Sequence, residues 1–364
     1  MRIALLSYST KPRGGVVHTL ALAEALAAAG AEVTVWSLGR GGDQAFFRPV
    51  DPAVRLRVVP FPDGPDGEGV GARILRSIDT LRVAFGPHAA SYDIVHAQDC
   101  ISANAAGRCV RTVHHIDHFT TPELAACHER AIVEPYAHIC VSAAVAAELA
   151  EGWGIKASVI PNGVAYERFA AAAEDEAGQG RWRHRLGRYV LTVGGIEPRK
   201  GSIDLLDAYA LLLHQHPDHR LVIAGGETLF DYRDYRARWE QRTAELGVEP
   251  IVLGAVPDDK LPSLVAAADA FAFPSVKEGF GLAAMEALAA NVPLVVRDLP
   301  VLREVFGPAA RFAAAPADLA AELDDALSGA DPARQAAGRR LAARHTWSEA
   351  ARSHLELYAS LVTR

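Results

Sequence analysis

The sequence is poor in cysteine and has no long uninterrupted apolar run. Its four cysteines (Cys100, Cys109, Cys127 and Cys140) lie apart from one another in the first half of the chain. This spacing indicates reduced, structural cysteines rather than a disulfide framework or a Cys-x-x-Cys metal site. No apolar run reaches the ~18 residues that a membrane span needs. Met1 leads directly into a strand-like segment, which leaves no room for a signal peptide. We therefore expect a soluble, cytoplasmic protein.

Charge is also scarce, at 22% of the residues, and it is slightly acidic, with a net charge of −7 and a pI near 6.1. An acidic chain of this kind is not expected to bind a nucleic-acid backbone. Half of the residues are hydrophobic, which is typical of a folded globular protein. A length of 364 residues exceeds what one core usually supports, so two domains are expected. The abundance of alanine is typical of a bacterial protein with a high-GC genome.

One stretch, residues 270–296, combines a buried strand, a glycine-bearing turn, a helix and a second strand. This order is the unit of a parallel α/β sheet. The turn places backbone N–H groups at the positive end of the helix dipole, which suits a phosphate. Glu278 precedes the helix, and Glu286 lies inside it on nearly the same face. A plain βαβ crossover with a solvated Glu278 explains the same pattern without a ligand.

The residues between the two glutamates carry a resemblance. EGFGLAAME, followed by PLVV, resembles the E-x7-E signature of the family-4 retaining glycosyltransferases, which have the GT-B fold. The resemblance implies that Glu278 contacts the donor sugar and that Glu286 binds the ribose hydroxyls. It also implies that the turn holds the phosphates through its N–H groups. The turn residues are Gly279, Phe280, Gly281 and Leu282.

Near the N-terminus a glycine pair, Gly14-Gly15, lies between a first strand and a long helix. The loop lacks the G-x-G-x-x-G pattern of a dinucleotide site, so the pair alone indicates a tight turn more than a ligand site. The layout nevertheless resembles the first βαβ unit of the same family. There the glycine pair faces the interdomain cleft, near donor phosphate or acceptor.

Histidines gather in the segment 112–118, which reads TVHHIDH. His114 and His118 would share a helix face and could bind zinc, but no distal Cys/His pair completes such a site. The threonine-apolar-histidine at the end of this strand instead resembles the cleft histidine of the family, which contacts the donor sugar. Position for position that residue is His114, and His115 is the alternative because the doubled histidine shifts the register by one.

The second half opens with a strand and the turn 194–201, GGIEPRKG. The turn resembles the VGR…RKG element of the family, with Gly195 in the place of its usual arginine. Arg199 and Lys200 remain, and two cations beside a departing diphosphate are what such chemistry needs. Arg199 is the candidate to replace the missing arginine.

Together these segments predict an α/β protein with two Rossmann-like domains that face a cleft. The first would span residues 1–168 and hold the acceptor. A polar linker over 169–188, which has no hydrophobic period, would lead to the donor domain, 189–346. The amphipathic helix 347–364 would cross back to the first domain, as in other GT-B enzymes.

The resemblance implies a retaining glycosyltransferase that uses a UDP- or GDP-linked sugar. Its acceptor is left open among a glycan, a lipid-linked molecule and a small molecule. His114, Glu278 and Lys200 would be the catalytic residues. We expect no cofactor and no metal, because Arg199, Lys200 and the glycine turn would neutralise the diphosphate. Retention would follow front-face attack or a covalent intermediate, for which Asp117 is a weak candidate nucleophile. We favour the front-face route.

Two other functions share the expected nucleotide site: a sugar-nucleotide epimerase of the same fold and an inactive nucleotide-sugar binding protein. A last feature concerns partners. The amphipathic segment 72–85 carries Arg73, Arg76 and Arg82 on one side. It predicts either the solvated face of a packed helix or a weak peripheral contact with an anionic membrane.

Overall fold

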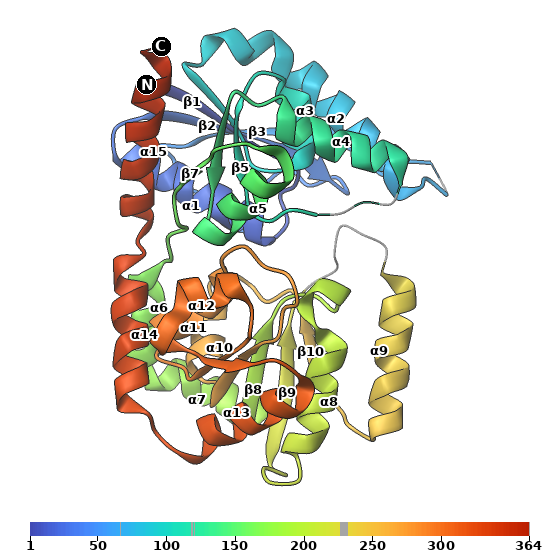
Figure 1. The fold of residues 1–364 in the computed structure, drawn as a ribbon, viewed down its shortest axis with the longest axis vertical. Helices are drawn as coiled ribbons and strands as arrows, with labels where there is room; N and C mark the ends of the chain where they lie inside the picture. The colour runs from blue at the N-terminus through green and yellow to red at the C-terminus, as the bar shows by residue number, and fades with distance from the viewer. Residues whose placement is uncertain (66, 118, 120, 226–231, 364) are drawn as a thin grey trace. The chain divides into compact units, whose positions relative to one another are not determined.

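The computed structural model describes residues 1–65, 67–117, 119, 121–225 and 232–363. Its contacts divide the chain into two compact units (Figure 1). Unit 1 comprises Met1–Gly163 together with Trp347–Arg364, and unit 2 comprises Val164–Thr346. The C-terminal helix therefore belongs to unit 1, which agrees with the expectation that it returns to the first domain.

Unit 1 contains, within its described residues, a seven-stranded parallel sheet in the order β3-β2-β1-β4-β5-β6-β7. The strands are β1 (Arg2–Ser7), β2 (Glu32–Arg40), β3 (Arg55–Phe61), β4 (Ile94–Ala97), β5 (Val110–Val113), β6 (Ala137–Cys140) and β7 (Ser158–Val159). The helices are α1 (Gly14–Ala28), α2 (Val70–Phe85), η1 (Gly86–Ser91), α3 (Cys100–Ala106), α4 (Pro122–Val133), α5 (Ala143–Trp153) and α15 (Trp347–Val362).

Helices cover both faces of this sheet. On one face α1 lies beside α15, and Leu20 of α1 shares a buried core with Tyr358 of α15 (Figure 1). On the other face Phe85 of α2 packs against Trp36 and Leu38 of β2. Because both faces are covered, β1 and β2 read as nearly continuous apolar runs instead of alternating ones.

Unit 2 contains, in the part of the chain that is described, a six-stranded parallel sheet in the order β10-β9-β8-β11-β12-β13. The strands are β8 (Arg188–Val193), β9 (His219–Ala224), β10 (Ile251–Gly254), β11 (Ala270–Phe273), β12 (Leu294–Arg297) and β13 (Arg311–Ala313). The helices are α6 (Tyr166–Glu174), α7 (Glu176–Leu186), η2 (Pro198–Lys200), α8 (Ser202–Leu212), α9 (Arg233–Leu246), α10 (Leu261–Ala266), α11 (Leu282–Ala289), α12 (Pro300–Phe306), η3 (Gly307–Ala309), α13 (Pro316–Ser328) and α14 (Pro332–Arg344). The predicted class, two α/β units of Rossmann type, is confirmed.

The segment 169–188 differs from its prediction as a linker, because it forms most of α6 and all of α7 inside unit 2. Asp175 caps α7 by accepting from the Gly178 N–H at 2.9 Å. The Gln179 amide donates to the end carbonyls of α6, and Trp182 donates to Ser263 at 3.0 Å. Caps and polar contacts with α10 hold these helices together with a few buried apolar side chains, Phe169 of α6 and Leu186 of α7 among them.

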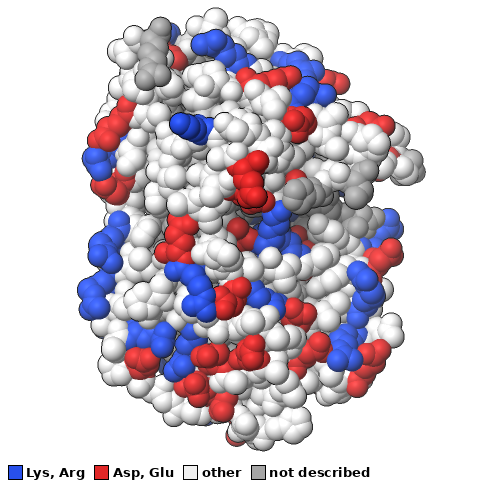
Figure 2. Space-filling view, viewed as in Figure 1, with Lys and Arg blue, Asp and Glu red and all other residues white. Residues whose placement is uncertain are grey.

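On the face drawn in Figure 2, basic and acidic side chains are interspersed. The arginines of α2 follow this pattern. Arg76 forms two 2.7 Å hydrogen bonds with Glu68, and Arg82 pairs with Asp79 at 2.8 Å. These pairs offset the positive charge that favoured a membrane contact. Within the described residues, no helix combines the length and the apolar character that crossing a membrane requires.

Candidate functional site

The centre of the candidate site is an ion cluster in unit 2 that joins two loops. Glu278 Oε1 accepts from Lys200 Nζ at 2.5 Å and from Arg199 Nη1 at 3.1 Å. Arg199 Nη2 also lies 3.3 Å from Glu197 Oε1. The Glu278 side chain is only 10% exposed and that of Lys200 19% exposed, so bulk water screens this cluster weakly. Three residues singled out from two distant motifs thus meet at one point.

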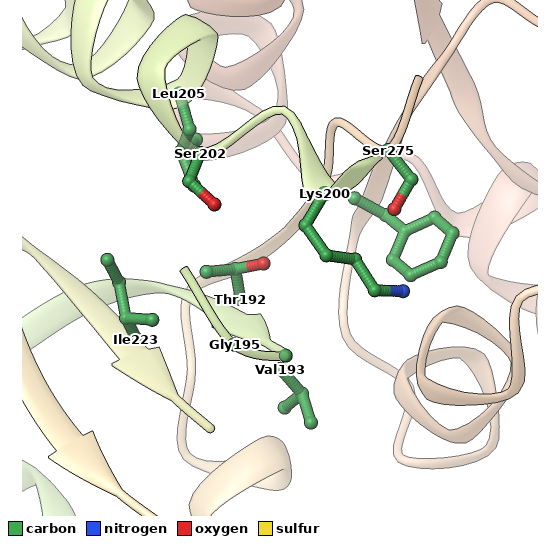
Figure 3. A pocket seen from close by; sticks show the side chains of 10 residues that line it. Thr192, Val193, Gly195, Lys200, Ser202, Leu205, Ile223 and Ser275 are labelled. Carbon is green, nitrogen blue, oxygen red and sulfur yellow. The ribbon is translucent and has the colours of Figure 1, made fainter. Parts of the chain in front are cut away.

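The first loop follows β8, and its glycines make room for Lys200. A Cβ on Gly194 would lie 3.5 Å from the Lys200 stem, which therefore runs close along a bare backbone. Gly201 has a φ of +63°, and a Cβ there would lie 2.3 Å from the Pro274 carbonyl oxygen. A small hollow opens beside this loop (Figure 3). Its lining comprises Thr192, Val193, Gly194, Gly195, Lys200, Ser202, Leu205, Ile223, Phe273 and Ser275.

Gly195, which stands where the family has arginine, belongs to that lining. A Cβ on Gly225 would lie 2.1 Å from the Gly194 carbonyl oxygen and 2.7 Å from the Gly195 nitrogen. The backbone at Gly225 therefore packs directly against the backbone of Gly194 and Gly195. The Arg199 guanidinium of this loop contacts Glu278. Arg199 thus lies beside Lys200, where the sequence predicted a second cation.

The second loop runs into α11 through Gly281, whose φ is +94°. A Cβ on Gly281 would lie 3.1 Å from the Phe306 ring, so both the backbone angle and the available space require glycine. Leu282 is the first residue of α11, and the first N–H groups of that helix have no partner inside it. Gly279 and Phe280 are buried, and the Phe280 ring packs 5.8 Å from that of His345. Phe280 can therefore offer a ligand its main chain but not its ring.

Glu286 lies one turn into α11, half-buried and apart from the ion cluster. Burial raises the pKa of its carboxyl from 4.5 to about 8; the charge of Arg168 opposes the shift and that of Asp258 adds to it. Arg168 and Asp258 pair with each other at 2.8 Å. Glu286 is therefore largely protonated near neutral pH in the free protein, and its hydroxyl can donate as well as accept hydrogen bonds.

In unit 1 the structure brings two other predicted residues together. His114 directly follows β5, and its ring lies 3.9 Å from where a Cβ on Gly15 would stand. Gly14 begins α1, is exposed and has space around its α-carbon. Burial, then the charges of Arg111 and two other histidines, lower the pKa of His114 well below 6.5, which keeps its ring neutral. His114 Nε2 is buried and, among the described residues, has no hydrogen-bond partner.

Sequence reasoning missed the side chains behind His114. The ring of His18, on α1, meets that of His114 edge-on at 4.8 Å, and its Nδ1 lies 2.9 Å from Asn162 Oδ1. Burial lowers the pKa of His18 well below 6.5 as well. Further along, His96 bonds Tyr358 of α15 at 2.6 Å and Thr112 at 2.7 Å. These residues are scattered along the chain, so no local motif could indicate the cluster.

The adjacent residues His114 and His115 lie in different environments. His115 Nε2 lies 3.2 Å from Asp117 Oδ2, so its ring already has a carboxylate partner. The assignment of the cleft histidine to His114 stays a prediction, and the neighbouring Gly15 favours it. His118, the other member of the zinc alternative, lies outside the described residues. Among the described residues, no group of three or more His, Cys, Asp or Glu side chains is arranged to hold a metal ion.

Comparison with known proteins covers both units. Residues 12–168 match the family model described as "Glycosyltransferase Family 4", and residues 182–353 match "Glycosyl transferases group 1". A phosphatidyl-myo-inositol mannosyltransferase of Mycobacterium leprae is 29% identical, over 100% of this chain and 98% of the relative. Sucrose-phosphate synthase of Thermosynechococcus elongatus superposes with a TM-score of 0.78 at 20% identity, covering 100% and 99% of the two chains. Anabaena HepE, solved with UDP-glucose, gives 0.77 at 20% identity, covering 99% and 100%.

The two sheets and these structural neighbours define the GT-B fold. The two family matches, one in each half of the chain, support glycosyltransferase activity.

Proposed function

We propose that the protein is a retaining glycosyltransferase that takes its sugar from a UDP- or GDP-linked donor. The observation that carries this proposal is the cluster of Lys200, Arg199 and Glu278 beside the start of α11. Two cations and the N–H groups of the first turn of α11, which have no partner inside the helix, are suited to a diphosphate, and one carboxylate among them is suited to sugar hydroxyls. The Anabaena neighbour is solved with UDP-glucose, which supports a nucleotide-sugar donor.

Lys200 and Arg199 would act on the leaving group. As the bond between the anomeric carbon and the phosphate oxygen breaks, its electron pair and a growing negative charge move to the diphosphate. Cations held in place beforehand stabilise that charge without reorganising. No metal is part of this proposal, because the two side chains and the α11 N-terminus would supply the positive potential.

Glu278 and His114 would orient the sugar, and Glu286 would bind the ribose hydroxyls, as the family resemblance implies. The neutral His114 ring keeps one buried nitrogen for a hydroxyl. We favour front-face attack. In this step the acceptor oxygen forms its bond on the side from which the diphosphate departs, and its proton passes to a phosphate oxygen of the leaving group.

Unit 1 would hold the acceptor, which we leave open among a glycan, a lipid-linked molecule and a small molecule. A relative's printed name, phosphatidyl-myo-inositol mannosyltransferase, makes inositol compounds and mannose donors the first to examine.

The deciding experiment incubates the purified protein with a panel of UDP- and GDP-linked sugars, mannose included, without acceptor. A glycosyltransferase releases free sugar slowly by transfer to water, an epimerase returns an altered donor, and a binding protein returns the donor unchanged. Lys200→Ala should lower kcat for this release roughly a hundredfold. Lys260→Ala, a matched change of an exposed lysine in unit 2, should leave it as in wild type. Equal release by both variants would place the chemistry elsewhere.

A further inference from the structure

Two loops of unit 2 carry the ion cluster, and they touch each other through their backbones. The loop after β8 carries Lys200, and the loop after β11 carries Glu278. The Val276 N–H of the second loop donates to the Arg199 carbonyl oxygen of the first at 2.9 Å. Lys200 and Ser275, one from each loop, line the same small hollow (Figure 3). The distance between Lys200 and Glu278 therefore depends on what holds these two loops in place.

Arg297, the last residue of β12, holds both loops at their ends. Its side chain is 10% exposed, and each of its three guanidinium nitrogens has a different partner. Nε donates to the carbonyl oxygen of Pro274, directly after β11, at 3.2 Å. Nη1 donates to the carbonyl oxygen of Ala314, directly after β13, at 3.0 Å. Nη2 donates to the carboxylate of Asp204, in the first turn of α8. One side chain thus joins the carboxyl ends of two strands to the start of the helix that follows Lys200.

Gly201 links Lys200 to α8, and it packs directly against this arrangement. A Cβ on Gly201 would lie 3.3 Å from Arg297 Nη2, and the same Cβ would lie 2.3 Å from the Pro274 carbonyl oxygen. The backbone next to Lys200 therefore contacts both the guanidinium and the carbonyl group that the guanidinium holds. A shift of Arg297 would move the start of α8, and Lys200 with it, relative to the loop of Glu278.

Stability is a weak reason for a charged side chain at this position. The other residues of β12, LVV, are apolar. Burying a guanidinium costs free energy, and an ion pair with a carboxylate that is 38% exposed returns only part of it. A guanidinium, however, presents its donors in a rigid planar fork, which fixes the relative positions of its partners. Since a catalytic group misplaced by about 1 Å loses roughly a hundredfold in rate, such positioning matters for turnover.

We propose that Arg297 is a positioning residue, whose guanidinium holds the loop of Lys200 against the loop of Glu278 and so places the cation that neutralises the departing diphosphate. Its three nitrogens are bonded to protein groups, so Arg297 acts on the donor through Lys200. The effect on turnover rests on the proposed function, whereas the coupling of the two loops rests only on the contacts of Arg297.

The first test measures the coupling between Lys200 and Glu278 without any substrate. A double-mutant cycle of Lys200→Met and Glu278→Gln on the free energy of unfolding gives this coupling in wild type, and the cycle is repeated with Arg297→Lys. Lysine keeps the positive charge beside Asp204 but lacks the fork that holds two carbonyl groups as well. Arg297→Lys should therefore reduce the coupling to about half of its wild-type value or less. Undiminished coupling in this background overturns the proposal.

Two further variants complete this test. Arg311→Lys is the matched control, because Arg311 begins β13, at the other end of the neighbouring strand, and pairs with Glu322 at 3.2 Å. This variant should leave the coupling unchanged, and a loss equal to that in Arg297→Lys would contradict the proposal. Asp204→Asn removes the partner on α8 through a side chain that is 38% exposed, so it decides the question if Arg297→Lys does not fold. It should weaken the coupling in the same direction.

The second test measures the donor site. Arg297→Lys should lower the kcat of donor hydrolysis roughly tenfold and weaken the binding of UDP and GDP. Its affinity for uridine and guanosine should stay as in wild type, because these nucleosides lack the diphosphate that Lys200 meets. An equal change for nucleosides and diphosphates, or no change for either, refutes the positioning role. A wild-type protein that neither releases sugar nor binds nucleotide would count against the proposed function, whereas the coupling in the first test would still decide the role of Arg297.

Discussion

Replacing Glu278 with glutamine should tighten the binding of a nucleoside diphosphate while it slows turnover. In the free protein one carboxylate oxygen holds both Lys200 and Arg199, at 2.5 and 3.1 Å. A diphosphate must draw these two cations away from Glu278 or share them with it. Glutamine keeps the shape of the side chain and removes the competing charge. The diphosphate then meets both cations without competition from Glu278, although Glu197 still lies 3.3 Å from Arg199.

The size of the expected change in Kd follows from the geometry of the cluster. A hydrogen bond to a charged group contributes ~1.5–3 kcal/mol, and the side chains of Glu278 and Lys200 are less than one-fifth exposed. Since 1.4 kcal/mol corresponds to a factor of ten, the Kd should fall roughly ten- to a hundredfold. Turnover should fall, because the carboxylate proposed to orient the sugar is lost.

Isothermal titration with UDP and GDP measures the predicted fall in Kd, and the kcat of donor hydrolysis measures the predicted loss of turnover. Uridine and guanosine serve as controls: they lack phosphate, so Glu278→Gln should not change their affinity. The tightening should shrink as salt is added, since it is electrostatic. An unchanged or weaker affinity for the preferred diphosphate would show that the cluster is a structural ion pair and not a phosphate site.

Three further predictions concern pH, the buried contact between helix and sheet, and metal ions. The raised pKa of Glu286 stabilises the fold fully below the unfolded value of 4.5, and this contribution is lost as pH rises to about 8. The free energy of unfolding of wild type relative to Glu286→Gln should therefore fall by up to ~1.4 kcal/mol per pH unit across that window; a flat difference in chemical denaturation contradicts it. Tyr358→Phe should cost ~1–3 kcal/mol of unfolding free energy because it leaves the buried His96 Nδ1 without its 2.6 Å partner, and an unchanged denaturation midpoint would refute this. Donor hydrolysis should survive excess EDTA; loss that Mn²⁺ restores would mean that a metal, and not Lys200, neutralises the diphosphate.

The sequence was most informative where neighbouring residues determine the structure. The glycine turn before α11 could be predicted because φ at Gly281 admits little else, and the turn brings Glu278 to the helix N-terminus. The order of strand, glycines and lysine likewise predicted that Lys200 lies in the turn after β8. That Lys200 and Glu278 touch, with 77 residues between them, follows only from the parallel pairing of β8 with β11.

What the sequence could not indicate depends on long-range packing. His18 sits in an alanine- and leucine-rich helix and gives no sign of its contact with His114. The segment of α6 and α7 reads as a linker because the polar contacts of Asp175, Gln179 and Trp182 produce no apolar period. The few apolar side chains that it buries, such as Phe169 and Leu186, are spread over two short helices.

The assignment of Trp347–Arg364 to unit 1 has a consequence for synthesis on the ribosome. Chains usually fold from the N-terminal domain onward as they emerge, at ~5–20 residues per second. Here the last helix of unit 1 follows the whole of residues 164–346, so roughly ten to forty seconds of translation separate the two parts of its core. Unit 2 is complete on the nascent chain while the face of α1 around Leu20 still lacks Tyr358. Folding therefore finishes with the first domain, and a ribosome that stalls near residue 346 presents that uncovered face to chaperones.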